Sequence, residues 1–305
     1  MEEEIILQLV NDIRSKLPSL GTAKLLFMIA PTLASHNIKV GRDYFFDLLR
    51  DHRLLIRQRK RKVYTTNSRH WMKKYANLST TLTINRPDQL WVSDMTFIRL
   101  TNQWGYLSLI TDAYSRKIVG YCFRVDMLAV GCVEALKMAL ANRRDPTAPL
   151  MHHSDRGSQY CCKDYTDLLM AHNVCISMTQ CGSPYENALA ERINGIIKGE
   201  FDLYQSSTGF ENTYDKIRQS IQLYNNFRPH SSCDNLTPQQ AHCKTGPLNK
   251  KWKTYRFAKN KQDSFEQSVG ATIAPNRSVH YGGISQSQGL NYGCKVLLGL
   301  KTNDV

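Results

Sequence analysis

The sequence predicts an α/β protein in which a β-sheet core follows a helical N-terminal domain and precedes a basic C-terminal extension. Between residues 87 and 204, β-rich runs alternate with stretches of helical periodicity. The formal net charge of +14 is concentrated at the two ends, because residues 86–200 hold equal numbers of basic and acidic residues. Basic ends attract polyphosphate by releasing its counterions, which favours nucleic acid as a partner. The expected regions are a helical domain at 1–62, a linker at 63–86, the core with its following helix at 87–240 and the extension at 241–305.

The N-terminal region is predicted to contain short helices. Residues 21–37 have apolar side chains at helical spacing, and we expect Pro31 to split this stretch into two pieces. Residues 42–52 form the next predicted helix, which leaves Arg42 and Arg50 available to a ligand. A helix, a short turn and a basic helix are typical of a helix-turn-helix, the alternative being a generic helical hairpin. A basic run that could follow a phosphate backbone comes next, with Arg57, Arg59, Lys60, Arg61 and Lys62.

The core is predicted to begin with three β-rich runs joined by short turns, which indicates an antiparallel meander. These runs are residues 89–100, 104–114 and 117–125. The elements that follow are a helix at 128–142, a strand at 148–155, a helix at 158–173, a strand at 174–179 and a long helix at 183–204. Three strands, a helix, a strand, a helix, a strand and a helix is the order of the ribonuclease H-like fold.

Three acidic residues fall at positions of this fold that can bring them together. Asp94 lies in the middle of an apolar strand, where a carboxylate loses hydration unless a cation pairs with it. Asp155 ends the fourth strand, at the edge where open sheets place ligand sites, and Glu191 lies on the last helix. Mg²⁺ prefers oxygen ligands, and two such ions about 4 Å apart can activate the attacking oxygen and stabilise the leaving oxygen of a phosphoryl displacement. The three residues therefore predict a two-metal site for phosphoryl transfer.

Each acid also has a purely structural interpretation. Asp155 could cap the following helix, Asp94 could pair with an arginine, and Glu191 could be a solvated helix position. These interpretations weaken when they are taken together, because independent caps and surface charges would not be expected to meet at one end of a sheet. Glu186 and Glu200 on the same helix compete with Glu191, and Glu186 lies near the helix start, where a carboxylate favours the helix dipole.

Four sequence features carry a resemblance to a known family. They are the strand WVSDMTFI, the turn HSDRGSQY, the helix YENALAERINGIIKGE and the 35 residues that separate Asp155 from Glu191. Together they resemble the DDE transposase and retroviral integrase superfamily. The downstream segment YNNFRPHSSCDNLTP, residues 224–238, is similar to the OrfB-type transposases of the bacterial IS-three insertion sequences. The resemblance covers residues 20–240, and Glu200 fits its motif poorly.

The resemblance implies a DNA strand transferase that depends on Mg²⁺, with Mn²⁺ as a substitute. The implied catalytic and metal-binding residues are Asp94, Asp155 and Glu191. Such an enzyme cuts a strand at the end of an insertion sequence and uses the freed 3′-hydroxyl to attack another phosphodiester. The implied partners are double-stranded DNA at the element ends and the target, further copies of the chain in a dimer or larger assembly, and an upstream fusion partner made by frameshifting.

The resemblance also implies contacts to DNA. Lys198 follows Glu191 by two helical turns and shares its helix face, and a basic residue at this offset contacts end DNA in the superfamily. Asn194 lies on the same stripe, and a solvated lysine is the alternative for Lys198. In the downstream motif, Arg228 and His230 are the expected DNA contacts.

The C-terminal extension is predicted to form a further basic surface. Residues 250–261 interleave basic and aromatic side chains, a composition suited to phosphate contact and base stacking. The expected contacts are Lys250, Lys251 and Lys253. Residues 262–305 are rich in Gly, Ser, Asn and Gln, which is typical of partly disordered or strand-forming sequence.

Composition argues against several other classes. The sequence lacks a run of about 18 apolar residues and begins with glutamates rather than a basic secretory signal, so we expect a cytoplasmic bacterial protein that works on the nucleoid. The nine cysteines have no regular spacing and are expected to be free thiols. His152 and His153 beside Cys161 and Cys162 suit zinc by type, but adjacent strand residues point to opposite faces, so a zinc site is not expected. Asp112 is expected to serve turn chemistry.

Two other functions stay open at this point. A stand-alone metal-dependent nuclease of the same fold would cut DNA without joining it. A non-catalytic DNA-binding protein would retain only the scaffold. The downstream motif with its basic tail weakly disfavours the first, and the intact acidic triad disfavours the second.

Overall fold

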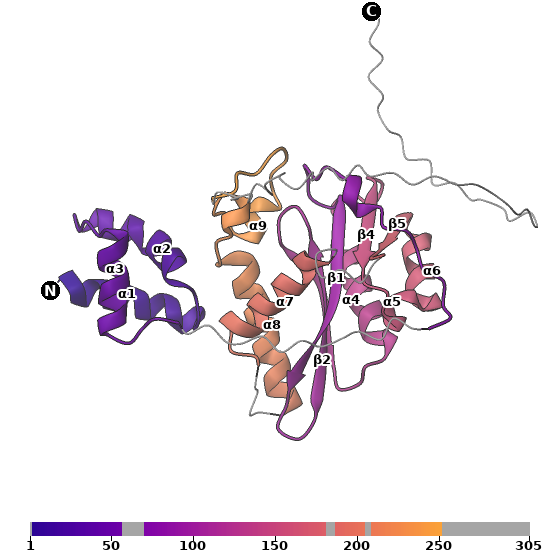
Figure 1. Cartoon of the computed structure of the whole chain (residues 1–305), viewed down its shortest axis with the longest axis horizontal. Helices are drawn as coiled ribbons and strands as arrows, with labels where there is room; N and C mark the ends of the chain where they lie inside the picture. Colours follow the sequence, from indigo (N-terminus) through magenta and orange to yellow (C-terminus); the bar gives the residue numbers. More distant parts are fainter. Residues whose placement is uncertain (1, 57–69, 181–186, 205–208, 252–305) are drawn as a thin grey trace, which may run out of the picture. The chain divides into compact units, whose positions relative to one another are not determined.

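The N-terminal part of the protein is a small helical domain. The structure, a computed structural model, describes residues 2–56, 70–180, 187–204 and 209–251 (Figure 1). The helices of this domain are α1 (Glu2–Lys16), α2 (Thr22–Ser35) and α3 (Arg42–Asp51). Their apolar stripes form a core from Ile6, Val10, Leu25, Ile29, Phe45 and Leu49. The helical domain expected from the sequence is therefore present.

Pro31 does not split α2, and this expectation was wrong. The helix runs from Thr22 to Ser35 with Pro31 inside it. Proline removes one hydrogen bond, the one to the carbonyl of Phe27. Because Pro31 is exposed, water can hydrate that carbonyl. The buried side chains of Ile29 and Leu33 on either side of the proline hold both turns against the domain core.

The core contains one mixed sheet with the strand order β3-β2-β1-β4-β5 (Figure 1). Its strands are β1 (Leu90–Arg99), β2 (Trp104–Asp112), β3 (Ile118–Arg124), β4 (Leu150–Ser154) and β5 (Val174–Met178). The first three strands pair antiparallel, whereas β4 runs parallel to both β1 and β5. The predicted meander is confirmed, and so is the ribonuclease H-like fold class.

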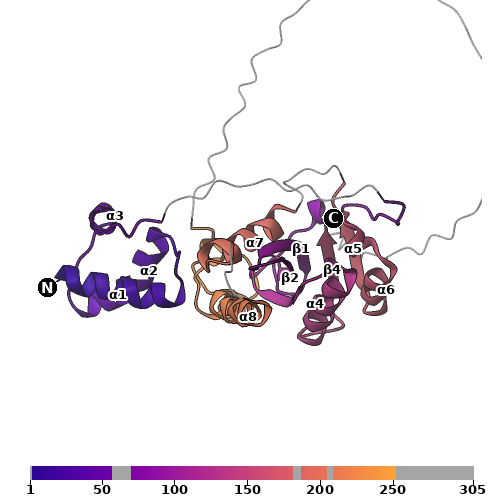
Figure 2. The same cartoon turned by 90° about the horizontal axis from the view of Figure 1, so that it is seen from below.

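Helices cover both faces of this sheet (Figure 2). They are α4 (Ala129–Ala141), α5 (Ser158–Cys161), α6 (Lys163–Ala171), α7 (Ala188–Glu200), α8 (Phe210–Asn226) and α9 (Pro238–Ala241), with 3-10 turns at Ser79–Thr81 and Ser231–Cys233. One face packs against α4 and α6, and Trp91, Leu136 and Leu169 belong to the core cluster on that face. The other face packs against α7 and α8, and Leu109 and Ile193 belong to the core cluster there. In the part of the chain that the structure describes, no helix is both long and apolar enough to cross a membrane.

The stretch predicted as one helix at 158–173 forms two. Cys162 separates α5 from α6 because its backbone is extended, with φ −67° and ψ 153°. Its carbonyl accepts the first backbone hydrogen bond of α6, from Thr166, and its thiol donates to the carbonyl of Gln159. Because of this break, Tyr160 of α5 and Tyr165 of α6 are both buried in the same core cluster.

Two segments outside the predicted core boundaries pack against it. The carbonyl of Ala76 accepts a hydrogen bond from the backbone N–H of Met178 at 3.2 Å, beside the edge of β5. The backbone N–H of Gly246 donates to the carbonyl of Asn85 at 2.7 Å, and its own carbonyl accepts from the Tyr114 hydroxyl. Residues 70–86, expected as linker, and 241–251, expected as extension, therefore contact the core.

Gly120 on β3 lies against α4 with no room for a side chain. A Cβ atom there would lie 2.1 Å from the carbonyl oxygen of Ala135 and 2.9 Å from the Cβ of Ala139. We expect Gly120→Ala to destabilise the protein by about 1–3 kcal/mol, because the backbone of α4 must shift. Urea denaturation measures this. Gly131→Ala on α4 is the control, because its Cβ would meet side-chain atoms of Arg124 and Ser108 at 3.1 Å or more and no backbone atom; equal losses in both variants would contradict the packing argument.

Candidate active site

Asp94 and Asp155 lie on neighbouring parallel strands. The β1–β4 register pairs Leu90 with Met151 and Val92 with His153. Two further residues along the same register bring Asp94 beside Asp155, which directly follows β4. The Asp155 carboxylate accepts a hydrogen bond from the backbone N–H of Gly157 at 2.9 Å, which fixes the turn into α5. Asp155 thus helps to shape the turn and lies beside Asp94, but it does not cap α5 as its structural interpretation proposed, because the N-cap residue of α5 is Gly157.

Glu191 is brought to the same strand by α7, which packs against β1. It lies in the first turn of α7, and its backbone N–H donates to the carbonyl of Asn187 at 3.2 Å. The buried side chain of Asn187 donates to the carbonyl of Ser93 at 2.9 Å. Asn187 therefore connects the start of the helix that carries Glu191 to the strand residue before Asp94.

The three carboxylates interact electrostatically. Burial, the negative charge of Asp155 and that of Glu191 raise the pKa of Asp94 to about 7, against hydrogen bonds from Asn194 and from the backbone of Met95. Among the described residues, no lysine or arginine forms an ion pair with Asp94, so the structural interpretation that paired it with an arginine is not supported. Negative charges close to the poorly hydrated carboxylate of Asp94 are destabilising without a cation.

This donor set fits divalent cations. It offers carboxylate oxygens, the ligands that Mg²⁺ prefers, from three separate elements. The three carboxylates are not among the groups whose ligand atoms all lie within 4.8 Å of one another in the described part of the chain.

Asn194 does not reach the surface, so the structure does not support its expected contact with DNA. Its side chain is only 4% exposed, and its Nδ2 donates to Asp94 Oδ2 at 2.8 Å. Helical spacing places Asn194 one turn after Glu191, and the side chain points from there toward β1 instead of outward. Asn194 therefore orients the Asp94 carboxylate.

Lys198 lies close enough to Asp94 to interact with its charge. Burial lowers the pKa of this lysine, and the negative charge of Asp94 opposes that shift. Its ammonium group lies 5.5 Å from the centre of the Tyr204 ring. The solvated alternative does not apply, because the side chain is partly buried.

Arg228 and His230 are buried, so the structure does not support the expectation that they contact DNA. The guanidinium of Arg228 is 2% exposed and donates two hydrogen bonds of 2.6 Å to the carboxylate of Glu200. His230 is also buried, and burial lowers its pKa well below the ordinary value. Arg228 forms its ion pair with Glu200 inside the protein. Glu200 is therefore no longer a candidate metal ligand.

The whole downstream motif has a structural role. The Tyr224 hydroxyl donates to the carbonyl of Arg116 at 2.9 Å, and the Asn225 amide exchanges two hydrogen bonds with the backbone of Ile118. Thr237 caps α9 in a capping box with Gln240. The contacts of Tyr224 and Asn225 attach α8 to the start of β3, and the capping box fixes the start of α9.

The remaining basic candidates are exposed or lie outside the described residues. Arg42 and Arg50 are exposed on α3, where Arg50 pairs with Asp47. Lys250 is exposed, and Lys251 pairs with Asp234 at 2.6 Å. Arg57, Arg59, Lys60, Arg61, Lys62 and Lys253 lie outside the described residues, as does Glu186.

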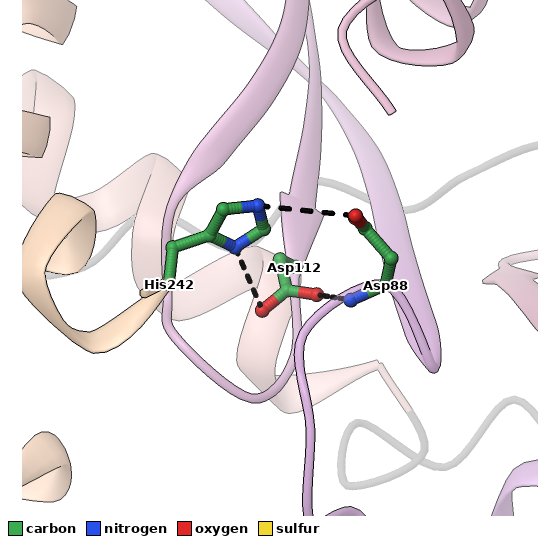
Figure 3. Close-up of side chains that lie close together, drawn as sticks. All are labelled: Asp88, Asp112 and His242. Atoms are coloured by element: carbon green, nitrogen blue, oxygen red, sulfur yellow. Dashed lines mark hydrogen bonds and ion pairs between the residues drawn. The ribbon is translucent and has the colours of Figure 1, made fainter. Parts of the chain in front are cut away.

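A second cluster of ionisable residues lies away from these acids. The side chains of Asp88, Asp112 and His242 offer ligand atoms within 4.8 Å of one another (Figure 3). Asp112 accepts hydrogen bonds from the backbone of Asp88 and from the backbone and hydroxyl of Ser115, at 2.6–2.8 Å. Asp88 accepts from the indole of Trp91. These donors satisfy the carboxylates and confirm turn chemistry for Asp112, and the cluster joins α9 to the sheet.

No zinc cluster forms from the histidines before Asp155. Within residues 70–180, His152 and His153 bind serine hydroxyls and do not gather with Cys161 or Cys162. The described cysteines are free, as expected.

His152 predicts a specific dependence of stability on pH. Its Nε2 lies 2.6 Å from Ser93 Oγ and 2.9 Å from the Tyr165 hydroxyl, and burial lowers its pKa to about 3. Below a pH of about 6.5 the unfolded chain gains a proton at this histidine that the folded chain does not, so stability falls by up to about 1.4 kcal/mol per pH unit. Stability continues to fall down to a pH of about 3. The full contribution of neutral His152 to stability is present above a pH of about 6.5.

Urea denaturation between pH 4.5 and pH 7 measures this slope. The side chain of His152→Gln can still accept the two hydrogen bonds. We expect this variant to reduce the slope by about 1.4 kcal/mol per pH unit, which corresponds to the uptake of one proton. His172→Gln, at an exposed position, is the control. An unchanged slope in His152→Gln would contradict the burial of a neutral histidine.

The fold and the three carboxylates define the integrase class of ribonuclease H-like cores. Two family models, both described as "Integrase core domain", match residues 84–184 and 172–238. The "Insertion element IS600 uncharacterized 31 kDa protein" of Shigella sonnei is 36% identical over 208 residues, which cover 68% of this chain and 76% of the relative. The chain therefore belongs to the DDE transposase and integrase superfamily, and within it to the IS3 type.

Other relatives match a shorter part of the chain. The "Transposase InsF for insertion sequence IS3A" of Escherichia coli (strain K12) is 35% identical over 155 residues, half of this chain and 54% of that protein. Among solved structures, the HTLV-2 integrase catalytic core domain in complex with magnesium matches with a TM-score of 0.42 and 17% identity, covering 52% of this chain and 97% of that chain.

Proposed function

We propose that this chain cleaves DNA strands at the ends of an insertion sequence and joins the freed 3′-hydroxyl to another phosphodiester. Asp94, Asp155 and Glu191 are the proposed catalytic residues and ligands of Mg²⁺, for which Mn²⁺ can substitute. The observation that carries the proposal is the placement of Asp94 beside Asp155 by the β1–β4 register, together with the hydrogen bond that holds the start of α7, the helix of Glu191, to the strand residue before Asp94. Unrelated surface acids would not be expected to share such a place.

The chain's own residues prepare the site for a phosphodiester. When bound, divalent ions would activate the attacking oxygen and neutralise charge on the leaving oxygen. Asn194 orients the Asp94 carboxylate, and Asn187 fixes the start of α7 on β1. Lys198 is placed to bind a substrate phosphate, because its ammonium lies near Asp94 and keeps only part of its hydration.

The proposed partner is double-stranded DNA, both at the element ends and at the target. Arg42, Arg50, Lys250 and Lys251 are exposed and supply proposed phosphate contacts. Joining two ends requires two active sites, so we propose a dimer or larger assembly on DNA. We also propose that the chain has an upstream fusion partner and that it acts on the bacterial nucleoid in the cytoplasm.

The test is strand chemistry by the purified protein on labelled element-end DNA with Mg²⁺ or Mn²⁺. We expect cleaved and joined products, and a loss of about a thousandfold or more in Asp155→Asn, because several kcal/mol of transition-state stabilisation depend on the metal ligands. An asparagine can still accept the hydrogen bond from Gly157, so the turn and DNA binding should persist. Asp167→Asn on the exposed face of α6 is the control.

Three results separate the functions. Joined products that depend on Asp155 support the transferase. Cleavage without joining would identify a nuclease. DNA binding without strand chemistry in the wild type would identify a non-catalytic DNA-binding protein and overturn the proposal.

A further inference from the structure

Trp71 is a large apolar side chain that the fold holds in solvent. Its side chain is 92% exposed, the highest value among the large hydrophobic residues described. Burying an indole is worth about 2–3 kcal/mol, so exposing one forgoes that stabilisation. The described surface of Trp71 is therefore available to a ligand.

The neighbours of Trp71 are anchored on both sides. The His70 ring lies 2.8 Å from the carbonyl of Arg156 through its Nε2. Met72 and Tyr75 pack against the core cluster beneath α4 and α6. The carbonyl of Ala76 accepts from Met178 at the edge of β5. Trp71 thus projects from a fixed segment, and its exposure is not that of a loose chain end.

This segment lies next to the candidate active site. His70 contacts the residue that directly follows Asp155. The thiol of Cys161, whose pKa burial raises to about 11, also responds to the charges of Asp155, Lys74 and Arg156. These three charged side chains therefore act on the same thiol of α5.

The surroundings of Trp71 are basic. From residue 52 to residue 87 the sequence contains no aspartate or glutamate. Lys73 and Lys74 are exposed, and the ammonium of Lys73 lies 5.0 Å from the centre of the Tyr75 ring. A flat aromatic face between cations is complementary to a nucleotide, which presents a base face and a phosphate. A second copy of this basic segment would be repelled instead.

We propose that Trp71 stacks on an unpaired or terminal nucleobase beside the phosphate that is cleaved, while Lys73, Lys74 and Arg156 contact flanking phosphates. The inference rests on the proposed function for the presence of DNA at Asp155. Within an intact duplex both faces of a base are covered, so an indole reaches a base only where the strand ends or opens. Cleavage at an element end creates such a place.

The test measures DNA binding by fluorescence anisotropy in EDTA, which prevents cleavage. The probes are a labelled duplex with a short unpaired flank and the same duplex with abasic sites in the flank. We expect Trp71→Ala to weaken binding to the first probe by about five- to a hundredfold, the range for one stacked base, and to leave binding to the abasic probe unchanged. Trp71→Phe should keep most of the affinity.

Trp104→Ala is the matched control. Trp104 is 40% exposed at the start of β2, and its ring lies 4.9 Å from the guanidinium carbon of Arg99, so it is also an aromatic residue beside a cation. It should not distinguish the two probes.

Several outcomes would overturn the stacking proposal. Trp71→Ala could bind the unpaired probe as tightly as wild type, or lose equal affinity for both probes. A change of molecular mass in light scattering without a change in DNA affinity would assign the surface to a second copy of the chain. Failure of the proposed function is a separate result, in which wild type binds element-end DNA but never cleaves it with Mg²⁺.

Discussion

Replacing Asp94 with asparagine is expected to abolish strand cleavage and to stabilise the metal-free protein. Burial and two neighbouring negative charges oppose the ionised form of Asp94, whose pKa rises to about 7. Removing the charge at pH 8 should therefore raise the free energy of unfolding by about 1–3 kcal/mol. This range is smaller than the full pKa shift would give, because solvent still screens the charge of Asp94 in part. Activity should fall by about a thousandfold or more, because a metal ligand is lost.

The surroundings of Asp94 can accept an asparagine. Asn194 donates its Nδ2 to Asp94, while its own Oδ1 has no hydrogen-bond partner among the described residues. A flip of the Asn194 amide would present this oxygen to the new amide at position 94. The substitution therefore keeps the hydrogen bond and removes only the charge.

Asp112→Asn is the matched control for the effect on stability. Asp112 is also buried, but three donors point at its carboxylate. An asparagine at this position would point its own N–H group at one of these donors. We therefore expect the free energy of unfolding to fall by about 1–3 kcal/mol. Urea denaturation in EDTA compares the two variants. Destabilisation of Asp94→Asn to the same extent as Asp112→Asn would contradict the proposed repulsion.

Replacing Arg228 with alanine is expected to destabilise the fold by about 3–5 kcal/mol, because the carboxylate of Glu200 loses its cation in a poorly hydrated place. Arg228 is almost fully buried, and its two hydrogen bonds reach the end of α7. Arg218→Ala on α8 is the control, because that arginine pairs with Asp215 at the exposed surface, where ion pairs are worth about 0–1 kcal/mol.

Denaturation and DNA binding together test the role of Arg228. We expect the double variant Arg228→Ala with Glu200→Ala to recover part of the lost stability, because no unpaired charge remains. DNA affinity of the folded fraction should be unchanged. If Arg228→Ala kept wild-type stability and lost DNA affinity, the sequence-based expectation would be right and the structural role wrong.

The strands and the acidic residues could be predicted because both leave local signals. Three β-rich runs with short turns define the meander, and the order of elements then fixes where Asp94, Asp155 and Glu191 lie. Spacing along a helix also located Lys198 near the acids. These features depend on neighbours in sequence or on a fold with few alternatives.

The site predictions that the structure does not support concern side chains whose partners lie far away in the sequence. Arg228 looks like a free cation until α7 brings Glu200 to it, and Asn194 looks exposed until β1 brings Asp94 to it. A basic residue in a recognisable motif can serve folding as well as binding. Exposure is likewise a property of the folded chain, so Trp71 gave no signal in the sequence.

We propose above all that Asp94, Asp155 and Glu191 together bind divalent cations. Anomalous diffraction from crystals grown with Mn²⁺ tests it most directly. We predict Mn²⁺ in contact with the carboxylates of Asp94 and Asp155, with an ion on Glu191 when DNA is present, and loss of these ions in Asp94→Asn. Absence of Mn²⁺ from these three carboxylates, or its binding only at Asp88, Asp112 and His242, would contradict the claim.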